Sequence, residues 1–520
     1  MKPLRSIGNL YRDREGAPTR KILCIVALSA LLLATLTCGS GNLPSPRKPP
    51  GEITLKRLST DTFSNSSSQH ATEVEPDTFA FGSTIVSAFQ VGRRLGGGGA
   101  DIGFATSTDG GTTWVSGFLP GVSIYYQGGA FDGASDPVVA FDAAHGVWLI
   151  ASLTQGTDVL VSRSPDGINW SDQITDIPTP SDKDWIVCDN GAGSPFFGHC
   201  YLQWDDPNTG LLWMSTSTNG GLTWGPTLNP ADSIQGGGGQ PVVQPNGSVV
   251  VPFWSWVAND MRAITSSDGG ASWSASVQIS PITDHAVAGG LRSAVPLPSA
   301  EVDADGTVYV VWSDCRFRTG CSSNDLVMST SADGMSWTPP ARVPIDPVTS
   351  TVDHFIPGLA VDPATRGNTA HLTLAYYWYS QTNCTASDCA LNVGFVVSQD
   401  GGSTWSAPQT LAGPMSLAWL ANTNSGRMVG DYISTSYIGG QAYAVFAVAR
   451  ANSGTTFDEA MYTTEQPLPP LSSALHFSSK GEKPVPNAKS DHGPRKFQDE
   501  EHEISLPPAP SIAKSPSRSY

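Results

Sequence analysis

Charged residues are scarce in this chain, and basic residues are the scarcer kind. Asp, Glu, Lys and Arg make up 14% of the 520 residues, and the formal net charge at pH 7 is -17. Affinity for nucleic acid comes largely from clustered Lys and Arg, which an acidic chain with few basic residues cannot supply. We therefore expect no nucleic-acid partner.

The N-terminal region lacks an apolar run long enough to span a membrane comfortably. Its run, ILCIVALSALLLATL from Ile22 to Leu36, is about five residues short of such a span. Basic residues precede it, namely Arg5, Arg12, Arg14, Arg20 and Lys21. This layout is typical of a signal peptide, with a permanent transmembrane helix as the weaker alternative. We expect an exported protein, secreted, periplasmic or envelope-anchored, that contacts membrane only through this signal or a lipid on Cys38.

Cysteine spacing typical of zinc sites is absent, because the chain has no CxxC motif. With Cys24 and Cys38 set aside, six cysteines remain. They lie close in sequence as Cys188 and Cys200, Cys315 and Cys321, and Cys384 and Cys389. An even number of closely spaced cysteines in an exported chain favours disulfides that close local loops, although sequence alone leaves their connectivity open.

Two motifs of well-known hydrolases are also missing. Neither GxSxG nor HExxH occurs, so nothing in the sequence indicates serine or zinc hydrolysis. We expect no required cofactor. Paired carboxylates such as Asp182 and Asp184 could bind Ca²⁺, which prefers oxygen ligands, or could simply face water.

What the chain has in abundance is one short turn. It occurs six times, starting at Ser107, Ser164, Ser217, Ser266, Ser331 and Ser398. The first copy reads STDGGTTW, and the starts lie 57, 53, 49, 65 and 67 residues apart, enough for one small sheet per repeat. Its Asp can accept hydrogen bonds from backbone N–H groups, and its Gly adopts positive φ without strain. We expect a structural clip between two strands.

The segments around each turn predict four strands per repeat. The clearest unit reads SAEVDA, a DADG turn, TVYVVWS and DLVMSTS, which lead into Ser331. Such sheets, repeated without helices, are typical of propeller blades. Three strands follow the sixth turn, and ITLKRLS at Ile53 could supply their fourth. We therefore expect an all-β fold, a β-propeller of four-stranded antiparallel blades, with seven blades and with six as the alternative.

Composition sets the limits of this propeller. Residues 1–38 form the signal, 39–52 a flexible linker, 53–465 the propeller and 466–520 a Pro- and Ser-rich tail that cannot bury enough apolar surface to order itself. If the first strand of each blade is the innermost and the turn joins the third and fourth strands, each innermost strand begins on the face opposite the turns. That face collects the candidate functional residues Glu73, Glu75, Asp77, Arg93, Arg94, Asp101, Asp132, Asp136, Asp182, Lys183, Asp184, Trp185, Gln240, Trp254, Trp256, Arg292, Asp314, Arg316, Arg318, Asp353, His354, Arg427, Asp431 and Tyr432.

The repeated turn resembles the Asp-box, or bacterial neuraminidase repeat, of sialidases and other secreted propellers. The resemblance implies that its third residue is structural in each copy: Asp109, Asp166, Asn219, Asp268, Asp333 and Asp400. Sialidases use three arginines for the substrate carboxylate, a Tyr nucleophile assisted by Glu, and an Asp acid. Their FRIP stretch is absent here, and the nearest early arginines are Arg93 and Arg94.

Carried onto this chain, the resemblance implies a sialidase-like glycoside hydrolase acting on an acidic glycan as a monomer. The catalytic residues would be Asp101, Asp136, Glu301 and Tyr432, with Glu73 as an alternative to Glu301, and the substrate-binding residues Arg94, Arg292, Arg427 and Trp254. The first alternative is a non-catalytic propeller that binds a glycan or protein at the cell envelope. A third is cleavage of a neutral glycan or lysis of a polysaccharide by paired carboxylates alone.

Overall fold

The computed structural model describes residues 53–154, 157–292, 296–470, 476–486 and 488–490. The predicted signal and linker, including Cys38, lie outside the described residues. Within the part of the chain that is described, no helix is long and apolar enough to cross a membrane.

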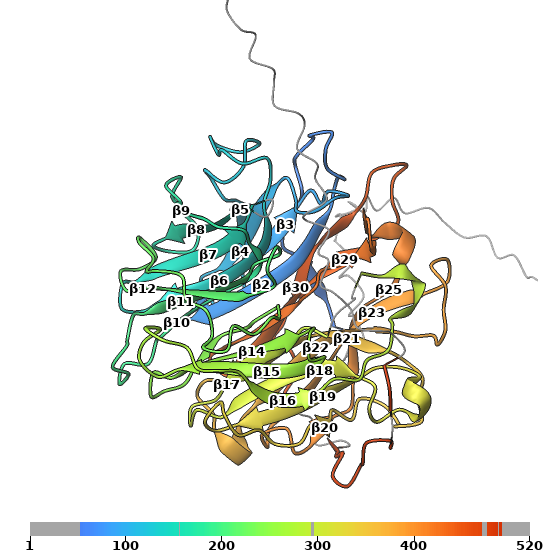
Figure 1. Cartoon of the computed structure of the whole chain (residues 1–520). Helices are drawn as coiled ribbons and strands as arrows, with labels where there is room; N and C mark the ends of the chain where they lie inside the picture. The colour runs from blue at the N-terminus through green and yellow to red at the C-terminus, as the bar shows by residue number, and fades with distance from the viewer. Residues whose placement is uncertain (1–52, 155–156, 293–295, 471–475, 487, 491–520) are drawn as a thin grey trace, which may run out of the picture. The chain divides into compact units, whose positions relative to one another are not determined.

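Antiparallel sheets follow one another in chain order as the blades of a propeller (Figure 1). Blade 1 contains β2 (Glu73–Phe81), β3 (Thr84–Val91), β4 (Asp101–Ser107) and β5 (Val115–Phe118). Blade 2 contains β6 (Ser135–Asp142), β7 (Val147–Leu153), β8 (Asp158–Ser164) and β9 (Thr175–Pro178). Blade 3 contains β10 (Asp182–Cys188), β11 (Cys200–Asp205) and β12 (Leu212–Ser217). A bridge from Met214 to Leu228 takes the place of its fourth strand.

The next blades repeat this order. Blade 4 contains β13 (Val242–Val243), β14 (Val249–Ser255), β15 (Asp260–Ser266) and β16 (Val277–Pro281). Blade 5 contains β17 (Ser299–Val302), β18 (Val308–Asp314), β19 (Asp325–Ser331) and β20 (Ala341–Arg342). Blade 6 contains β21 (His354–Val361), β22 (Leu372–Tyr379), β23 (Ala390–Ser398) and β25 (Gln409–Ser416). Short elements outside these strands are β24 (Trp405–Ser406), β26 (Ala421–Thr423), β27 (Gly426–Met428), β31 (His476–Phe477) and 3₁₀ turns at Ala288–Gly290, Thr319–Cys321, Gly367–Thr369 and Leu417–Trp419.

Blade 7 is built from both ends of the folded region. It contains β28 (Ser434–Ile438), β29 (Gln441–Ala449), β30 (Glu459–Thr464) and, as its fourth strand, β1 (Leu55–Arg57). Leu55 lies opposite Thr464 and Arg57 opposite Tyr462. The predicted seven-bladed ring closed by the N-terminal strand is therefore confirmed for the described residues, and the six-bladed alternative is wrong.

The repeated turn joins the third and fourth strands of a blade. In the first copy the Ser107 hydroxyl donates to Asp109 Oδ1 at 2.9 Å, and the Thr113 N–H donates to the same oxygen at 2.8 Å. Gly110 and Gly111 have φ of 72° and 88°, a region that glycine adopts without strain. The Trp packs against the preceding blade, as Trp170 does against Phe104 with ring centroids 5.9 Å apart. The turn therefore clips each sheet and seals its junction with the preceding blade.

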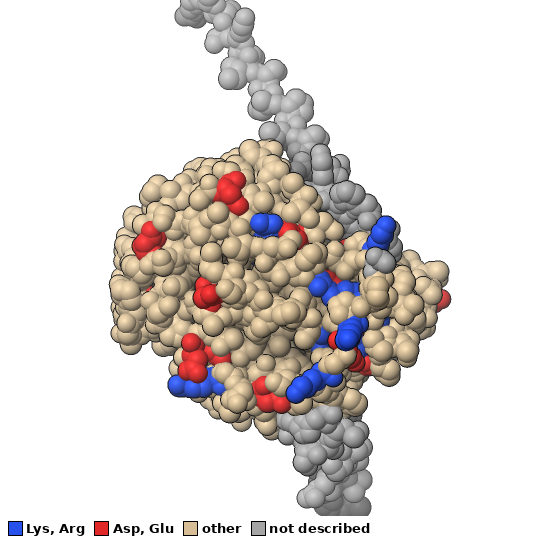
Figure 2. Space-filling model, turned by 60° about the horizontal axis from the view of Figure 1, so that its bottom comes forward, with Lys and Arg blue, Asp and Glu red and all other residues tan. Residues whose placement is uncertain are grey.

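All six turns lie at the same end of the blades, which we call the turn face. The other end, where the innermost strands begin, is the loop face. Most of the surface in Figure 2 belongs to uncharged residues, with acidic side chains only in separate patches. Several acids lie inside instead, because Glu73, Glu75, Asp101, Asp136 and Glu459 are fully buried.

The three predicted cysteine pairs are disulfides. Cys188–Cys200 joins β10 to β11, Cys315–Cys321 closes the loop after β18, and Cys384–Cys389 closes the loop after β22. Each bond closes a local loop, as the spacing predicts.

Part of the segment that we expect to be an unstructured tail contacts the propeller. Leu468 is buried, and its N–H donates to the carbonyl of Ala442 at 2.8 Å. Further along, β31 pairs with β24, and the Val485 N–H donates to the carbonyl of Arg316 at 2.7 Å. The described part of this segment therefore runs along the blades rather than away from them.

Candidate active site

Three innermost strands begin with a β-bulge that holds a charged residue in an unusual conformation. Glu75 on β2, Asp136 on β6 and Lys183 on β10 have φ of 56°, 47° and 36°. The pairing register of each strand shifts at the same place. A side chain other than glycine in this region costs roughly 1–3 kcal/mol, and such residues concentrate at functional sites. The bulges occupy equivalent positions on the loop face.

Lys183 connects these bulges. Its ammonium lies 3.3 Å from Glu75 Oε1 and 2.8 Å from Asp431 Oδ2, and it contacts Asp136 Oδ1. The Lys183 side chain is 5% exposed, and those of Glu75, Asp136 and Asp431 are 1%, 0% and 8% exposed. Blades 1, 2, 3 and 7 thus bring three carboxylates around one buried cation.

Arg292 and Tyr432 complete what we call the Lys183 cluster, with Glu75, Asp136, Lys183 and Asp431. Arg292 Nη2 lies 2.9 Å from Asp431 Oδ2, and Arg292 Nη1 contacts the sulfur of Met428 at 3.2 Å. Arg93 Nε contacts the same sulfur at 3.1 Å, so two guanidinium groups approach one point. The aromatic ring of Tyr432 lies 5.8 Å from the Lys183 ammonium.

The protonation of this cluster follows from its burial. Burial raises the pKa of Glu75 to about 7, against the opposing effect of the Lys183 charge. Burial also raises the pKa of Tyr432 well above its ordinary value, and the Glu75 charge adds to that shift. The Tyr432 hydroxyl donates to the carbonyl of Pro137 at 3.2 Å. The raised pKa favours the neutral phenol, and the nucleophile role of Tyr432 stays a prediction.

Three of the residues assigned from sequence meet in this cluster, namely Asp136, Arg292 and Tyr432. Two predicted catalytic residues lie elsewhere. Asp101 accepts hydrogen bonds from the Ile102 N–H at 2.7 Å and the Ser123 hydroxyl at 2.9 Å, and burial raises its pKa to about 8.

Glu301 lies on β17, where burial, with a smaller effect from the charge of Asp77, raises its pKa to about 8. It lines a cavity of about 380 Å³ at the ends of the innermost strands toward the turn face. Glu73, the alternative to Glu301, accepts from the Ser59 hydroxyl and the Met461 N–H near the ring closure. Within the described residues no contact joins Glu301 or Glu73 to Tyr432.

The three arginines predicted to bind a carboxylate have separate partners. Arg94 pairs with Asp132 at 3.1 Å and lies over the Tyr125 ring. Arg427 Nη1 donates to the carbonyl of Leu420 at 2.7 Å. Arg427 and Arg292 are joined through their backbones, since the Arg292 N–H donates to the Arg427 carbonyl at 2.6 Å. A clamp formed by all three guanidinium groups stays a prediction, and Arg93 takes the position near Arg292 that we expected for Arg94.

Trp254 is a core residue. It is 2% exposed and packs edge-on against Trp256 with ring centroids 5.9 Å apart. This burial leaves no exposed ring face on which a sugar could stack. A calcium site at Asp182 and Asp184 stays a prediction; the described side chains that group like metal ligands are Asp325, Asp346 and His354.

The role of Glu75, Lys183 and Asp431 was missed from sequence, although the strand order placed them on the loop face. A recurring signal marks part of the set. Glu75, Asp136 and Ile356 each precede a proline near the start of an innermost strand, and all three have positive φ. The acid-proline pairs at Glu75 and Asp136 could have drawn attention to both carboxylates.

Comparisons with known proteins show remote likeness only. No protein-family model matches the chain, and no curated protein matches it. Among solved structures, AofleA from Arthrobotrys oligospora is 16% identical, with a TM-score of 0.39 and coverage of 69% of this chain and 94% of that one. An ulvan lyase bound to a glucuronate-rhamnose sulfate ligand is 12% identical, with a TM-score of 0.46 and coverage of 79% and 96%. The intramolecular trans-sialidase from Ruminococcus gnavus is 14% identical, with a TM-score of 0.38 and coverage of 74% and 92%.

Proposed function

We propose that the protein is an exported, sialidase-like glycoside hydrolase that acts on an acidic glycan at the Lys183 cluster, and that its six repeated turns are Asp-boxes. The observation that carries this proposal is the meeting of charged residues from separate blades, three of them on energetically costly bulges. The three disulfides support export, because such bonds persist in oxidising compartments.

Most glycoside hydrolases use two carboxyl groups, one protonated and one ionised, and we propose such a pair here in place of the Tyr nucleophile of sialidases. Glu75 is suited to donate the proton, because its pKa of about 7 keeps a large fraction protonated near neutral pH. Asp136 contacts the same ammonium and supplies the second carboxylate. Both oxygens lie within hydrogen-bonding reach of one nitrogen, so the two groups can act on one glycosidic bond.

The acidic substrate is proposed from the arginines. Arg292 and Arg93 approach the Met428 sulfur from different parts of the chain, and a guanidinium fork matches two carboxylate oxygens. A sugar carboxylate would pair with Arg292, which also pairs with Asp431. In this scheme Tyr432 shapes the site and stays protonated.

The test is turnover of a fluorogenic panel of sialosides and neutral glycosides by the purified chain. We expect release from sialosides, and a loss of kcat of about 10²-fold or more in Asp136→Asn and Glu75→Gln, the range of general acid and base catalysis. Asp303→Asn is the matched control, because Asp303 is likewise buried, at 2% exposed, and hydrogen-bonded but lies in the hairpin turn after β17 on the turn face. Equal kcat in Asp136→Asn and Asp303→Asn would exclude the assigned site.

A non-catalytic glycan-binding propeller is the second candidate. It is favoured by the mutual pairing of the cluster, whose charges already satisfy one another, and by the hydrogen bond that holds Tyr432 as a phenol. Folded protein that turns over nothing in the panel but binds acidic glycans on an array, with binding lost in Arg292→Met, would establish this function instead.

A further inference from the structure

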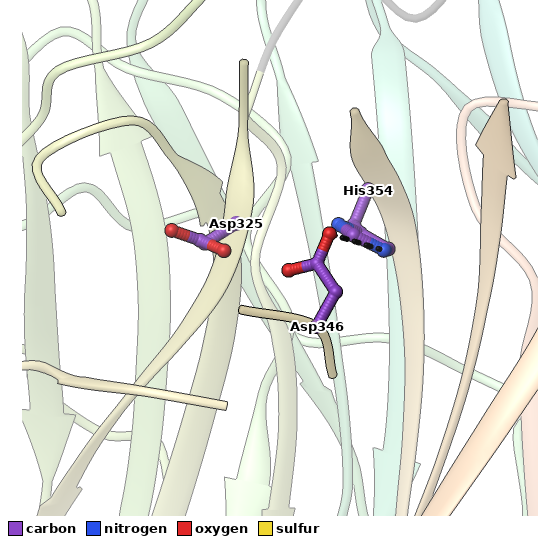
Figure 3. A group of neighbouring side chains, drawn as sticks. All are labelled: Asp325, Asp346 and His354. Atoms are coloured by element: carbon purple, nitrogen blue, oxygen red, sulfur yellow. Dashed lines mark ion pairs between the residues drawn. The ribbon is translucent and has the colours of Figure 1, made fainter. Parts of the chain in front are cut away.

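A second group of ionisable side chains lies on the loop face where blade 5 meets blade 6. Asp325 begins β19, Asp346 lies between β20 and β21, and His354 begins β21. One ligand atom from each lies within 4.8 Å of the other two. Figure 3 shows Asp346 between Asp325 and the His354 ring. This group has no part in the proposed hydrolase site.

The group contains buried polar atoms that lack a partner among the described residues. These are Asp325 Oδ2, Asp346 Oδ2 and Nδ1 of His354. The Asp325 and His354 side chains are 1% and 3% exposed. Buried carboxylate oxygens without donors are costly, and one water offers only two protons. Carboxylate oxygens that converge with an imidazole are better satisfied by a cation.

The spacing leaves room for an ion. Nε2 of His354 lies 4.0 Å from Asp346 Oδ2, which is too long for a hydrogen bond. Two ligand atoms on a tetrahedral zinc ion, each about 2.0–2.2 Å from it, lie roughly 3.4 Å apart, so the imidazole and the carboxylate would move a few tenths of an ångström closer on binding.

Two arginines hold the aspartates in place from the other side. Arg318 and Arg342 both contact Oδ1 of Asp325 and Oδ1 of Asp346, and among the described residues neither Oδ2 has a hydrogen bond to a guanidinium group. Partners of this kind orient metal-binding carboxylates. Glu482 Oε2 also lies 3.5 Å from Arg342 Nη1. The three carboxylates of Asp325, Asp346 and Glu482 thus carry one more charge than the two guanidinium groups.

We propose that Asp325, Asp346 and His354 form a binding site for a divalent transition-metal ion of the zinc type. An imidazole nitrogen with two carboxylate oxygens suits Zn²⁺, whereas Ca²⁺ and Mg²⁺ prefer oxygen ligands alone. Asp325 belongs to blade 5 and His354 to blade 6, so the ion ties neighbouring blades together.

The test is calorimetric titration of the full chain, stripped with a chelator, with ZnCl₂. We expect one strong site per chain and a higher midpoint of thermal unfolding with Zn²⁺, but not with Ca²⁺. Co²⁺ should give the visible absorption of a site with nitrogen and oxygen ligands. His354→Gln should weaken Zn²⁺ binding by about 100-fold or more, since loss of an outer partner alone costs about 10–100-fold.

His371→Gln is the matched control, because His371 also lies near an aspartate, 3.8 Å from Asp362, but outside the group. It should bind Zn²⁺ as the original chain does. If His354→Gln does not fold, the Zn²⁺ titration and thermal midpoint of the original chain still decide. No strong site and an unchanged midpoint would overturn the proposal, as would Zn²⁺ binding that survives His354→Gln intact.

Discussion

Two sets of acids in this propeller experience opposite environments. On the turn face, hydrogen bonds from neighbouring groups lower the pKa of Asp109 and Asp166 to about 2. On the innermost strands, burial raises the pKa of Glu75 and Asp77 to about 7 and that of Glu301 to about 8. The first set recurs in five of the six copies of the turn, with Asn219 in the remaining copy, whereas each member of the second occurs once.

The difference separates structural from candidate functional chemistry. A turn aspartate is ionised, accepts several N–H and O–H groups and stabilises one blade, so the same solution serves in each repeat. A buried carboxyl that resists ionisation destabilises the fold unless a partner compensates it. Lys183 is that partner for Glu75, Asp136 and Asp431. In this ring of similar blades, the candidate functional residues are therefore the ones that do not recur from blade to blade.

Removing Lys183 should produce the largest effect. Lys183→Met leaves Glu75, Asp136 and Asp431 without their shared cation, and breaking a buried ion pair in this way costs about 3–5 kcal/mol. Equilibrium unfolding in urea measures the loss. Lys56→Met is the control, because the exposed Lys56 ammonium donates to a carbonyl at 2.7 Å and its removal should cost little. Similar losses in both variants would show that the cluster does not depend on Lys183.

The two sets of acids should also respond to pH in opposite directions. The turn aspartates contribute stability above their ordinary pKa of 3.8, and it is lost as pH falls toward 2. For Glu301 the sign reverses, because its folded pKa of about 8 exceeds its ordinary value of 4.5. Its contribution is complete below 4.5 and is lost as pH rises through 8. The free energy of unfolding should therefore be greatest near pH 4, above the ordinary pKa of 3.8 of the turn aspartates and below the ordinary pKa of 4.5 of Glu301.

Glu301→Gln isolates the alkaline part of this profile. The amide cannot ionise, so the variant should lose less stability than the original chain between pH 4.5 and 8. Free energies of unfolding measured in denaturant across this range supply the comparison. A decline that matches the original chain at every pH would assign the effect to other buried acids.

The smallest effects should come from one turn. Asp400→Ala removes the acceptor of the Ser398 hydroxyl and the Thr404 N–H and should cost about 1–2 kcal/mol. Asp400→Asn keeps that oxygen and should cost less than about 0.5 kcal/mol. Asn219 already accepts the equivalent two bonds, each 3.0 Å long. Thermal unfolding of both variants tests the order, and a costlier Asn would mean that the charge itself holds the turn.

Most of the fold could be predicted because the same local pattern occurs several times in the sequence. Six turns, the alternating strands before them and the cysteine spacing each have a local physical meaning, and the leftover strand at Ile53 led to the seventh blade. Local rules also predicted that Glu75, Asp136 and Lys183 lie at the loop-face ends of their strands, where the structure has them, whereas Glu301 lies toward the turn face.

The site was harder to predict, because side-chain partners depend on bulges and on packing across blades. Whether Arg93 or Arg94 approaches Arg292 depends on how the loop after β3 turns, and neighbouring arginines look alike in sequence. Trp254 could be assigned from sequence either to the core or to a sugar, and it lies in the core against Trp256. The conformation of Glu75 at φ 56°, which aims it at Lys183, follows from no single residue preference.

The composite seventh blade has a consequence for how the molecule is made. Arg57 and its partner Asp458 are 401 residues apart. The ribosome therefore synthesises β1 long before β30, the strand with which β1 pairs. Until then β1 has no partner and the incomplete ring has open sheet edges, which invite pairing with other chains. Only a chain synthesised past β30 can remove them. The pairing of β1 with β30 therefore means that the ring can close only after β30 has been synthesised.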